Sequence, residues 1–447
     1  MKIIRKYIGD LFLSTRFYLG AGACIAVFVL AFFVPILLGP AVLLFVAFML
    51  LVLADYLFLF VAGNTPKAIR MVPPRLSNGD KNTVTLQIRN RNRFAIDMRI
   101  IDELPVQMQE RAFQLNKKFT SLQQQNIKYT VLPAERGSYE FGNILLYVSS
   151  KAGFVIRRFK IEAAQTVSVY PSYIQMRKYQ LLSKSATNNE TGAQRKRKIG
   201  QSMEFEQIKD YVSGDDMRTI NWKATARRGL LMVNNYVDEK SQQVYCVIDK
   251  GRLMKMPFNG LSLLDYAINA ALALTNVCLQ KQDKIGLITF SNKLDTLIPA
   301  ERKAMQRENI LQALYKEQTA FLESDYEMLY MQIRNKIKQR SLLVLYSNFE
   351  SVSGLRRQLP YLRSIARHHL LLVVFFENTE LNSLSQEEAI SVEDVYVKTV
   401  AEKFIFEKKL LVKELQKYGI SSILTAPELL TINSINKYLE LKARQAL

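Results

Sequence analysis

Acidic side chains gather in one short stretch of the chain, residues 204–239, which also holds the only tryptophan. The carboxylates of Glu204, Glu206, Asp215 and Asp216 are hard oxygen ligands of the kind that bind Mg²⁺, and a bound Mg²⁺ can activate water for hydrolysis. Arginines and lysines in the same stretch neutralise these acids, and neither a nucleophile nor a histidine base accompanies them. The composition therefore favours a structural or interaction role over a hydrolytic one.

A charge network around one aromatic ring is the structural interpretation of this stretch. Gly214 and Asp215 predict a turn, because glycine permits unusual backbone angles and aspartate bonds to nearby backbone. Arg218 and Arg227 can then pair with acids of the same stretch. These acids are Glu204, Glu206, Asp215 and Glu239. We expect Trp222 to bury its ring against the domain that follows while its N–H finds an acceptor, so that the stretch fixes the preceding segments onto that domain.

Three further oxygen-bearing side chains lie at the ends of predicted elements. Asp249 follows the first C-terminal strand, Ser324 is the expected N-cap of a helix, and Asn348 follows a later strand. Ligands of open α/β sheets bind at the carboxyl ends of the strands. Because hard oxygen ligands suit divalent cations, these residues form a candidate Mg²⁺ site, although a domain without any cofactor is the preferred expectation.

Residues 240–447 alternate apolar runs with helical patterns. The runs are Val244–Ile248, Ile285–Phe290, Leu342–Tyr346, Leu370–Phe376 and the weaker Ile420–Leu424, and the helical patterns lie near 260–280, 301–317, 326–339, 354–367, 400–418 and 427–445. Strands that are apolar on both faces and alternate with helices predict a mainly parallel sheet covered on both sides. We therefore expect a doubly wound α/β domain.

Residues 66–175 have a different pattern. Apolar residues alternate with polar ones over several short runs, such as Val84, Leu86 and Ile88, which turn residues separate. This period of two predicts a small antiparallel β-sandwich. Residues 176–203 are polar and basic and predict a linker.

The N-terminus has the composition of a membrane anchor. Residues 17–63 are almost wholly apolar, more than twice the roughly 20 residues that cross a bilayer, and a Leu-Gly-Pro sequence at 38–40 interrupts them. We expect a transmembrane hairpin with helices at about 17–37 and 41–62, preceded by a basic amphipathic helix over residues 1–16.

Cations flank the two predicted spans on both outer sides, whereas the turn has none. The positive-inside bias then places both ends and the soluble parts in the cytoplasm, which makes this a multi-pass protein of the cell (inner) membrane. Asp55, near the end of the second span, is expected to lie at the membrane interface rather than to mark an intramembrane site.

The chain is strongly basic, with 61 Lys and Arg against 40 Asp and Glu. A formal charge of +21 favours a polyanionic partner. With a membrane anchor next to it, anionic lipid is favoured over nucleic acid. Residues 377–394 are the exception, because they hold six acids and no Lys or Arg. They are expected to form a solvated loop or a docking surface near the carboxyl edge of the sheet.

The order of strands, helices and strand-end residues in 240–447 resembles a von Willebrand factor A domain. The family's metal-binding positions correspond here to Asp249, Gly251, Leu253, Ser324 and Asn348, of which only Asp249 keeps the family residue. The resemblance thus implies a degenerate metal site.

Residues 204–239 resemble the signature of the bacterial family called domain of unknown function 58. The matching residues are Glu204, Phe205, Asp210, Tyr211, Gly214, Asp215, Asp216, Arg218, Ile220, Trp222, Ala226, Arg227 and Glu239. The resemblance implies partnership with a MoxR-type AAA+ ATPase and with other von Willebrand factor A proteins rather than an activity of its own. We therefore expect a membrane-anchored interaction or scaffold protein and not an enzyme. The alternatives are a metal-dependent hydrolase using acids of 204–249 and a nucleic-acid binder.

Overall fold

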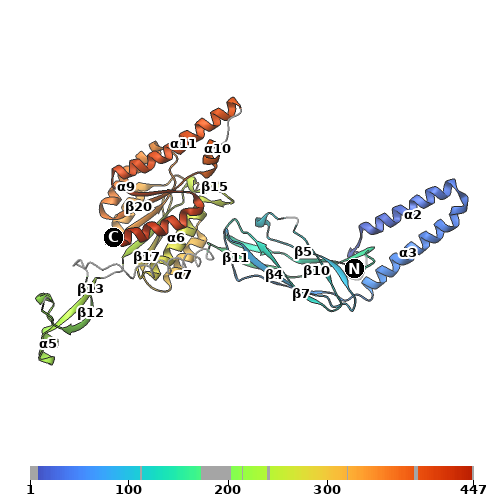
Figure 1. Ribbon diagram of the computed structural model, residues 1–447, viewed down its shortest axis with the longest axis horizontal. Helices are drawn as coiled ribbons and strands as arrows, with labels where there is room; N and C mark the ends of the chain where they lie inside the picture. The colour runs from blue at the N-terminus through green and yellow to red at the C-terminus, as the bar shows by residue number, and fades with distance from the viewer. Residues whose placement is uncertain are drawn as a thin grey trace. The chain divides into compact units, whose positions relative to one another are not determined.

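The computed structural model describes residues 9–110, 113–172, 203–213, 215–238, 242–319, 321–386 and 391–444. It divides into two compact units, Met1–Tyr170 and Pro171–Leu447, which Figure 1 shows with their elements labelled. The predicted linker at 176–203 falls almost wholly outside the described residues, apart from Met203, which begins a strand.

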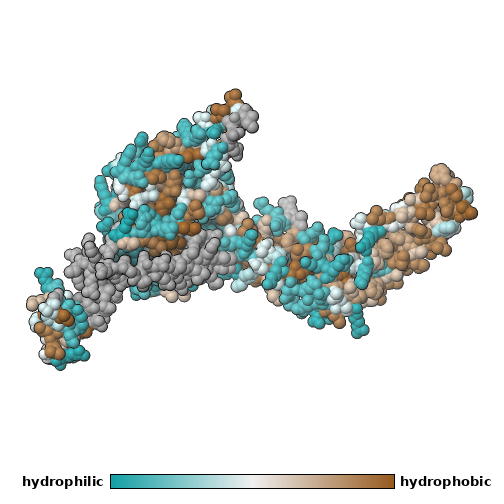
Figure 2. All heavy atoms as spheres, viewed as in Figure 1, coloured by the Kyte–Doolittle hydropathy of each residue, from teal (hydrophilic) through white to brown (hydrophobic). Residues whose placement is uncertain are grey.

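Two long apolar helices begin the first unit. Helix α2 spans Thr15–Phe33 and α3 spans Leu38–Phe60, with a short 3-10 helix, η2 (Pro35–Leu37), between them. At 1.5 Å per residue they are about 28 and 34 Å long, close to the roughly 30 Å of a bilayer's hydrocarbon core. Most of their side chains are exposed and apolar, as the brown surface in Figure 2 shows. The pair is thus long and apolar enough to span a membrane.

The predicted basic helix at 1–16 is wrong where the structure describes it. Leu11–Leu13 form a strand, β1, that pairs antiparallel with β10 (Val155–Ile161), and α2 starts at Thr15. Pairing with β1 satisfies backbone groups along β10 that would otherwise form an open sheet edge. Residues 1–8 lie outside the described part of the chain.

The rest of the first unit is β-rich, and its bounds are close to the predicted 66–175. Its strands are β2 (Lys67–Met71), β3 (Arg75–Ser77), β4 (Asn82–Arg89), β5 (Ile96–Asp102), β6 (Leu115–Phe119), β7 (Gln124–Val131), β8 (Gly137–Phe141), β9 (Ile144–Ser149), β10 and β11 (Gln165–Tyr170). They form sheets with the orders β1-β10-β9-β5-β6, β2-β4-β7 and β3-β11-β8. The pairing is antiparallel except between β3 and β11. Pro73 and Pro74 lack backbone donors, so the chain leaves the β2–β4 sheet there and β3 joins another.

The predicted alternation positions the core of this unit. Inward residues of β4 and β7 and of β5 and β9 share one buried cluster, including Val84, Leu86, Ile88, Ile100 and Leu146. The five-stranded sheet and the β2-β4-β7 sheet therefore pack against each other through their apolar faces.

Asp55 joins α3 to the β-rich part. Its side chain is buried; Oδ1 accepts from Ser150 Oγ at 2.5 Å, and Oδ2 accepts from the backbone N–H of Phe154 and Val155 at 2.9 and 3.0 Å. Arg157 also donates to the Leu59 carbonyl at 2.8 Å, near the end of α3. The carboxylate thus binds the turn between β9 and β10, and its expected position at a membrane interface stays a prediction.

Replacing Asp55 by Asn tests this junction. The amide keeps the shape but can accept on only one of its two atoms, so a buried donor loses its partner. We expect a loss of about 1–3 kcal/mol in the stability of the first unit. Hydrogen exchange of the β9 and β10 amides in the full chain in detergent would measure it. Asp97→Asn, at a half-buried position of β5, is the matched control. Equal protection of the β9 and β10 amides in the two variants would contradict the role of Asp55.

The second unit begins with a two-stranded arm. Strands β12 (Met203–Asp210) and β13 (Met232–Asp238) pair antiparallel, and their connection contains the 3-10 helix η4 (Met217–Thr219) and helix α5 (Trp222–Arg228). Asn221 caps α5 by accepting from Ala224 N–H at 3.0 Å, and Gly229 ends it with a left-handed φ of 71°.

The remainder is an α/β domain with a six-stranded mixed sheet. Its strands are β14 (Gln243–Asp249), β17 (Lys284–Phe290), β18 (Leu294–Glu301), β19 (Leu342–Tyr346), β20 (Leu370–Phe376) and β21 (Ser421–Thr425), in the order β18-β17-β14-β19-β20-β21. All five predicted strands are confirmed, and they run parallel. The sequence prediction missed β18, an antiparallel edge strand that contains Pro299, a residue that edge strands tolerate.

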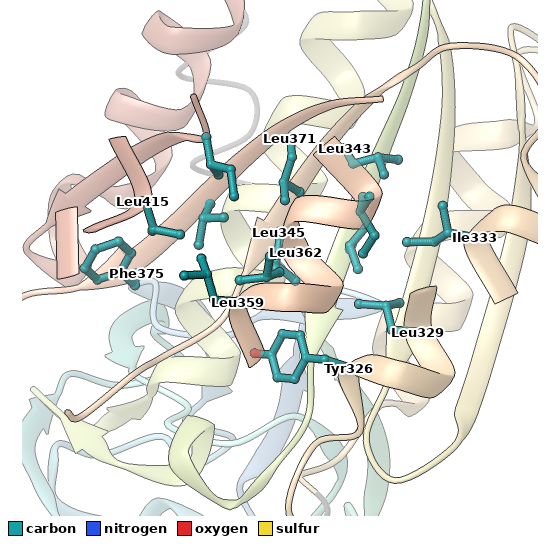
Figure 3. Packing of buried hydrophobic residues seen from close by; sticks show 14 of the residues in the cluster. Tyr326, Leu329, Ile333, Leu343, Leu345, Leu359, Leu362, Leu371, Phe375 and Leu415 are labelled. Atoms are coloured by element: carbon teal, nitrogen blue, oxygen red, sulfur yellow. The ribbon is translucent and has the colours of Figure 1, made fainter. Parts of the chain in front are cut away.

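Helices cover both faces of this sheet. Helices α6 (Leu263–Gln280), α7 (Gln306–Lys316) and α12 (Leu430–Ala443) lie together on one side. On the other, α8 (Tyr326–Lys336), α9 (Val352–His368) and α11 (Val392–Lys417) pack on the sheet through a buried cluster, part of which Figure 3 shows. Tyr326 lies at the edge of this cluster, and Figure 3 shows its hydroxyl oxygen in red. The acidic segment predicted as a loop at 377–394 instead contains α10 (Thr379–Gln386) and the start of α11.

Candidate functional site

A buried carboxylate lies at the carboxyl end of β14. Asp249 is 4% exposed. Its Oδ1 accepts from Gly251 N–H at 2.8 Å and from the Ser324 hydroxyl, while Oδ2 accepts from Ser347 Oγ at 2.6 Å and from the Tyr326 hydroxyl at 3.1 Å. The bond partners come from the loops after β14 and β19 and from the start of α8, so one side chain holds three segments together.

Burial dominates the electrostatics of this network. It raises the pKa of the Asp249 carboxyl above its usual value, and the donors from Ser324, Ser347 and Tyr326 only partly counter it. Burial, with the nearby Asp249 charge, also raises the pKa of the Tyr326 phenol well above its ordinary value. The phenol therefore remains a hydrogen-bond donor throughout the physiological range.

Asn348 has a different partner from the one expected. Its Oδ1 accepts from the Lys408 ammonium at 2.7 Å, and the same ammonium donates to the Phe349 carbonyl at 2.6 Å. Lys408 projects from α11, and burial lowers its pKa to about 8, with Glu350 opposing the shift. Asn348, one of the three predicted metal ligands, is thus paired with a lysine cation.

The donor set does not fit a divalent cation. Asp249 is the only carboxylate among the three predicted ligands, both of its oxygens are used by protein donors, and Asn348 is paired with a positive charge. A Cβ at Gly251 would lie 2.2 Å from Ser324 Oγ, so this loop leaves no room for the family's hydroxyl residue. Within the described residues, no group of three or more His, Cys, Asp or Glu side chains could hold a metal.

Sequence reasoning placed Asp249 beside Ser324 correctly but missed three residues of the site. Ser324 is not the N-cap of α8, because Asp325 accepts from Met328 N–H while Ser324 donates to Asp249. Ser347 directly follows β19, a position that could have identified it. In the sequence, Tyr326 has the pattern of an ordinary core residue of a helix. Lys408 lies 60 residues from its partner Asn348, so no local pattern identifies it.

Two cavities lie on either side of the Asn348 position, and Asn348 and Glu350 line both. The smaller, of about 190 Å³, contains the Asp249 network. The larger, of about 380 Å³, is mainly apolar. Its apolar lining comprises Met256, Pro257, Phe258, Leu263, Phe376, Leu381, Phe404, Ile405 and Pro427, and its ionisable lining comprises Glu350, Glu377, Glu380 and Lys408.

The signature residues are held differently from the predicted network. Asp215 pairs with Lys209 at 2.9 Å, and Asp216 accepts from the backbone N–H of Arg218 at 3.0 Å. The predicted burial of Trp222 is wrong, because its side chain is 70% exposed. Tyr211 is half-buried, and its backbone N–H donates to the Leu231 carbonyl at 2.8 Å.

The remaining predictions for the signature involve residues outside the described part of the chain. Gly214 and Glu239 lie outside the described residues, as does the side chain of Glu204, so the pairing predicted for Arg218 and Arg227 with these acids stays a prediction. Asp215 and Asp216 are bonded within the arm and Asp249 within its own network. A shared hydrolytic metal would require all three carboxylates to be released.

Replacing Tyr326 by Phe tests the Asp249 network. The variant removes one donor to the buried carboxylate and the 2.6 Å contact between the Tyr326 and Ser347 hydroxyls, while Ser347 keeps Asp249 as its acceptor. We expect the α/β domain to lose about 1–3 kcal/mol, measured by hydrogen exchange of β14 and β19. Tyr330→Phe, on the same helix, should leave exchange unchanged; if both variants behaved alike, the phenol would not support the network.

The lowered pKa of Lys408 predicts a pH dependence. Between about pH 8 and its ordinary pKa of 10.5, the unfolded chain holds a proton here that the folded domain has released. Stability should therefore rise with pH across this window. Lys408→Met should remove the rise, whereas Lys409→Met, an exposed neighbour, should retain it. Thermal unfolding from pH 7 to 10 measures both, and a rise that persists in Lys408→Met would refute the assignment.

The chain is similar to proteins without an assigned activity. It is 23% identical over 217 residues to "Uncharacterized protein YeaD" of Bacillus subtilis, which covers 46% of this chain and 53% of that protein. It is also 23% identical over 166 residues to "Uncharacterized protein Rv1480" of Mycobacterium tuberculosis, covering 37% and 51%. The chain thus spans about half the length of the curated relatives it matches.

Among solved structures, the crystal structure of the conserved hypothetical protein BatB from Bacteroides thetaiotaomicron matches 46% of this chain and all of that chain, with 12% identity and a TM-score of 0.32. A family model described as "Protein of unknown function DUF58" matches residues 207–402, which include most of the arm, Asp249, Ser324 and Asn348.

Proposed function

We propose that this protein is a membrane-anchored interaction protein whose α/β domain binds a protein partner at the carboxyl edge of its sheet. The observation that carries the proposal is the cavity of about 380 Å³ beside Asn348 and Lys408. Its floor is apolar, while its ionisable groups are three glutamates and one lysine that already has two acceptors. An apolar side chain next to a Lys or Arg would suit this lining.

The anchor is the pair of helices α2 and α3. Their length and apolar surface support two passes through the bacterial inner membrane. Cations on both outer sides of the pair favour a cytoplasmic location for the soluble units. Some of these cations also have structural partners, since Arg70 forms a buried ion pair with Asp102 and Arg16 donates to the Lys151 carbonyl.

The resemblance supplies the class of partner. We propose that the chain is a member of the domain of unknown function 58 family, that residues 240–447 form a von Willebrand factor A-like domain, and that the chain serves a MoxR-type AAA+ ATPase as adaptor, alongside other von Willebrand factor A proteins. The match over 207–402 supports the first part, and the parallel sheet with Asp249 at the end of β14 supports the second. Direct binding through fixed side chains takes the place of a metal-bridged contact.

Two phenylalanines of α11 allow a matched test. Phe404 lines the cavity and is 46% exposed, whereas Phe406 does not line it and is 61% exposed. Phe404→Ser should weaken binding to a purified MoxR-type AAA+ ATPase about tenfold, the value of one truncated anchor, and Phe406→Ser should not. The measurement is biolayer interferometry with the full chain in nanodiscs.

Three results would decide the proposal. Loss of affinity in Phe404→Ser alone supports the cavity as the docking site. Equal affinities for both variants and the unmodified chain would place the partner elsewhere. An absence of measurable binding by the unmodified chain would remove this ATPase class as the partner.

A further inference from the structure

The connection between β12 and β13 carries a surface that is both apolar and cationic. We call residues 217–231 the arm tip. Four of its apolar side chains are exposed: Met217 at 72%, Trp222 at 70%, Leu230 at 64% and Leu231 at 47%. The same 15 residues contain Arg218, Lys223, Arg227 and Arg228 and no Asp or Glu. Figure 2 shows hydrophobic and hydrophilic atoms side by side over this arm.

The local structure of the arm tip holds these side chains outward. Asn221 caps α5, Gly229 ends it, and Thr225 Oγ1 accepts from Met232 N–H at 3.0 Å. Trp222 is the first residue of this capped helix, so its exposure belongs to a hydrogen-bonded turn and not to a frayed end. Exposing an indole and two leucines on one short connection is costly in water and indicates that something covers them.

We propose that the arm tip docks on an anionic lipid surface. Trp and aliphatic side chains partition into the membrane interface, where the indole keeps its N–H near the headgroups. Arginines and lysines next to them are attracted to anionic headgroups. The ion pair between Arg228 and Asp210 is 3.9 Å long and about two-thirds exposed at both ends, so it neutralises the tip little.

This inference rests on the membrane anchor proposed above. A chain held at a bilayer by α2 and α3 encounters lipid at a high effective concentration, so even a short patch can bind. An acidic protein surface would match the same charges, but the combination of one Trp, two Leu and cations without acids is the composition of an interfacial lipid contact. The protein surface is therefore the competing outcome of the test.

Trp222 is the only tryptophan of the chain, so its fluorescence reports on the arm tip alone. The full chain would be reconstituted into nanodiscs whose scaffold protein carries no tryptophan, made of phosphatidylcholine with or without phosphatidylglycerol, and with lipids brominated on their acyl chains. With phosphatidylglycerol, we expect emission to shift to shorter wavelength and to be quenched by the bromines. In phosphatidylcholine alone, or at high salt, it should be quenched by aqueous iodide instead.

Charge reversal supplies the matched variants. Arg227→Glu with Arg228→Glu should lose the bromolipid quenching and return the emission to that seen in phosphatidylcholine alone. Arg302→Glu with Lys303→Glu changes the net charge equally at an exposed site of the α/β domain and should keep the quenching. If both double variants lost the quenching, lipid binding would depend on the total charge of the chain. That result would overturn the arm tip as the site.

The remaining outcomes are also decisive. If iodide still quenched the Trp222 emission in nanodiscs that contain phosphatidylglycerol, the proposal would be overturned. A shift to shorter wavelength without bromolipid quenching would mean that protein covers Trp222, which overturns it as well. Incorporation into the discs is scored separately by co-migration, so failure of the anchor, which would remove both proposals, is distinguishable from failure of the arm tip alone.

Discussion

The carboxyl edge of the α/β sheet depends on one buried carboxylate. Asp249 has lost its hydration, and four neutral donors from three chain segments replace it. A buried charge of this kind is tolerated only when its lone pairs are satisfied. The loop after β14, the serine after β19 and the start of α8 are therefore constrained together. Four residues of this network, Asp249, Gly251, Ser324 and Tyr326, line the smaller cavity.

Lys408 changes what this edge can do. A metal ion in such a position is exchangeable and can share a ligand with a partner, whereas an ammonium on α11 is covalently fixed and already donates to Asn348 and Phe349. In the proposed function, recognition at this edge would rely on shape and on direct ion pairing, which does not vary with metal supply. The three glutamates of the larger cavity set the sign of charge that such a surface prefers.

Sequence patterns predicted the parts of the fold that depend on regular periodicity. The five parallel strands and the two apolar helices were predicted because each corresponds to a uniform apolar run in the sequence. The edge strand β18 and the strand at Leu11–Leu13 did not, since both are defined by the sheet edge they cover. For the site, Asp249 was predictable from a strand end, and Ser324 was singled out by its place before a predicted helix. Tyr326 and Lys408 were not, because their role comes from contacts 77 and 60 residues away. The exposure of Trp222 shows that residue type alone does not fix burial.

The junction at Asp55 fastens the β-rich part of the first unit to helix α3. Its carboxylate and the Arg157 contact fasten the β9–β10 turn to α3 through several bonds, with no intervening hinge. Spanning helices tilt to match the thickness of the bilayer around them. In the proposed membrane anchor, a tilt of this helix of 23 residues would also rotate the β-rich part that is bonded to it. The thickness of the membrane would then determine the angle at which the β-rich part stands to the bilayer.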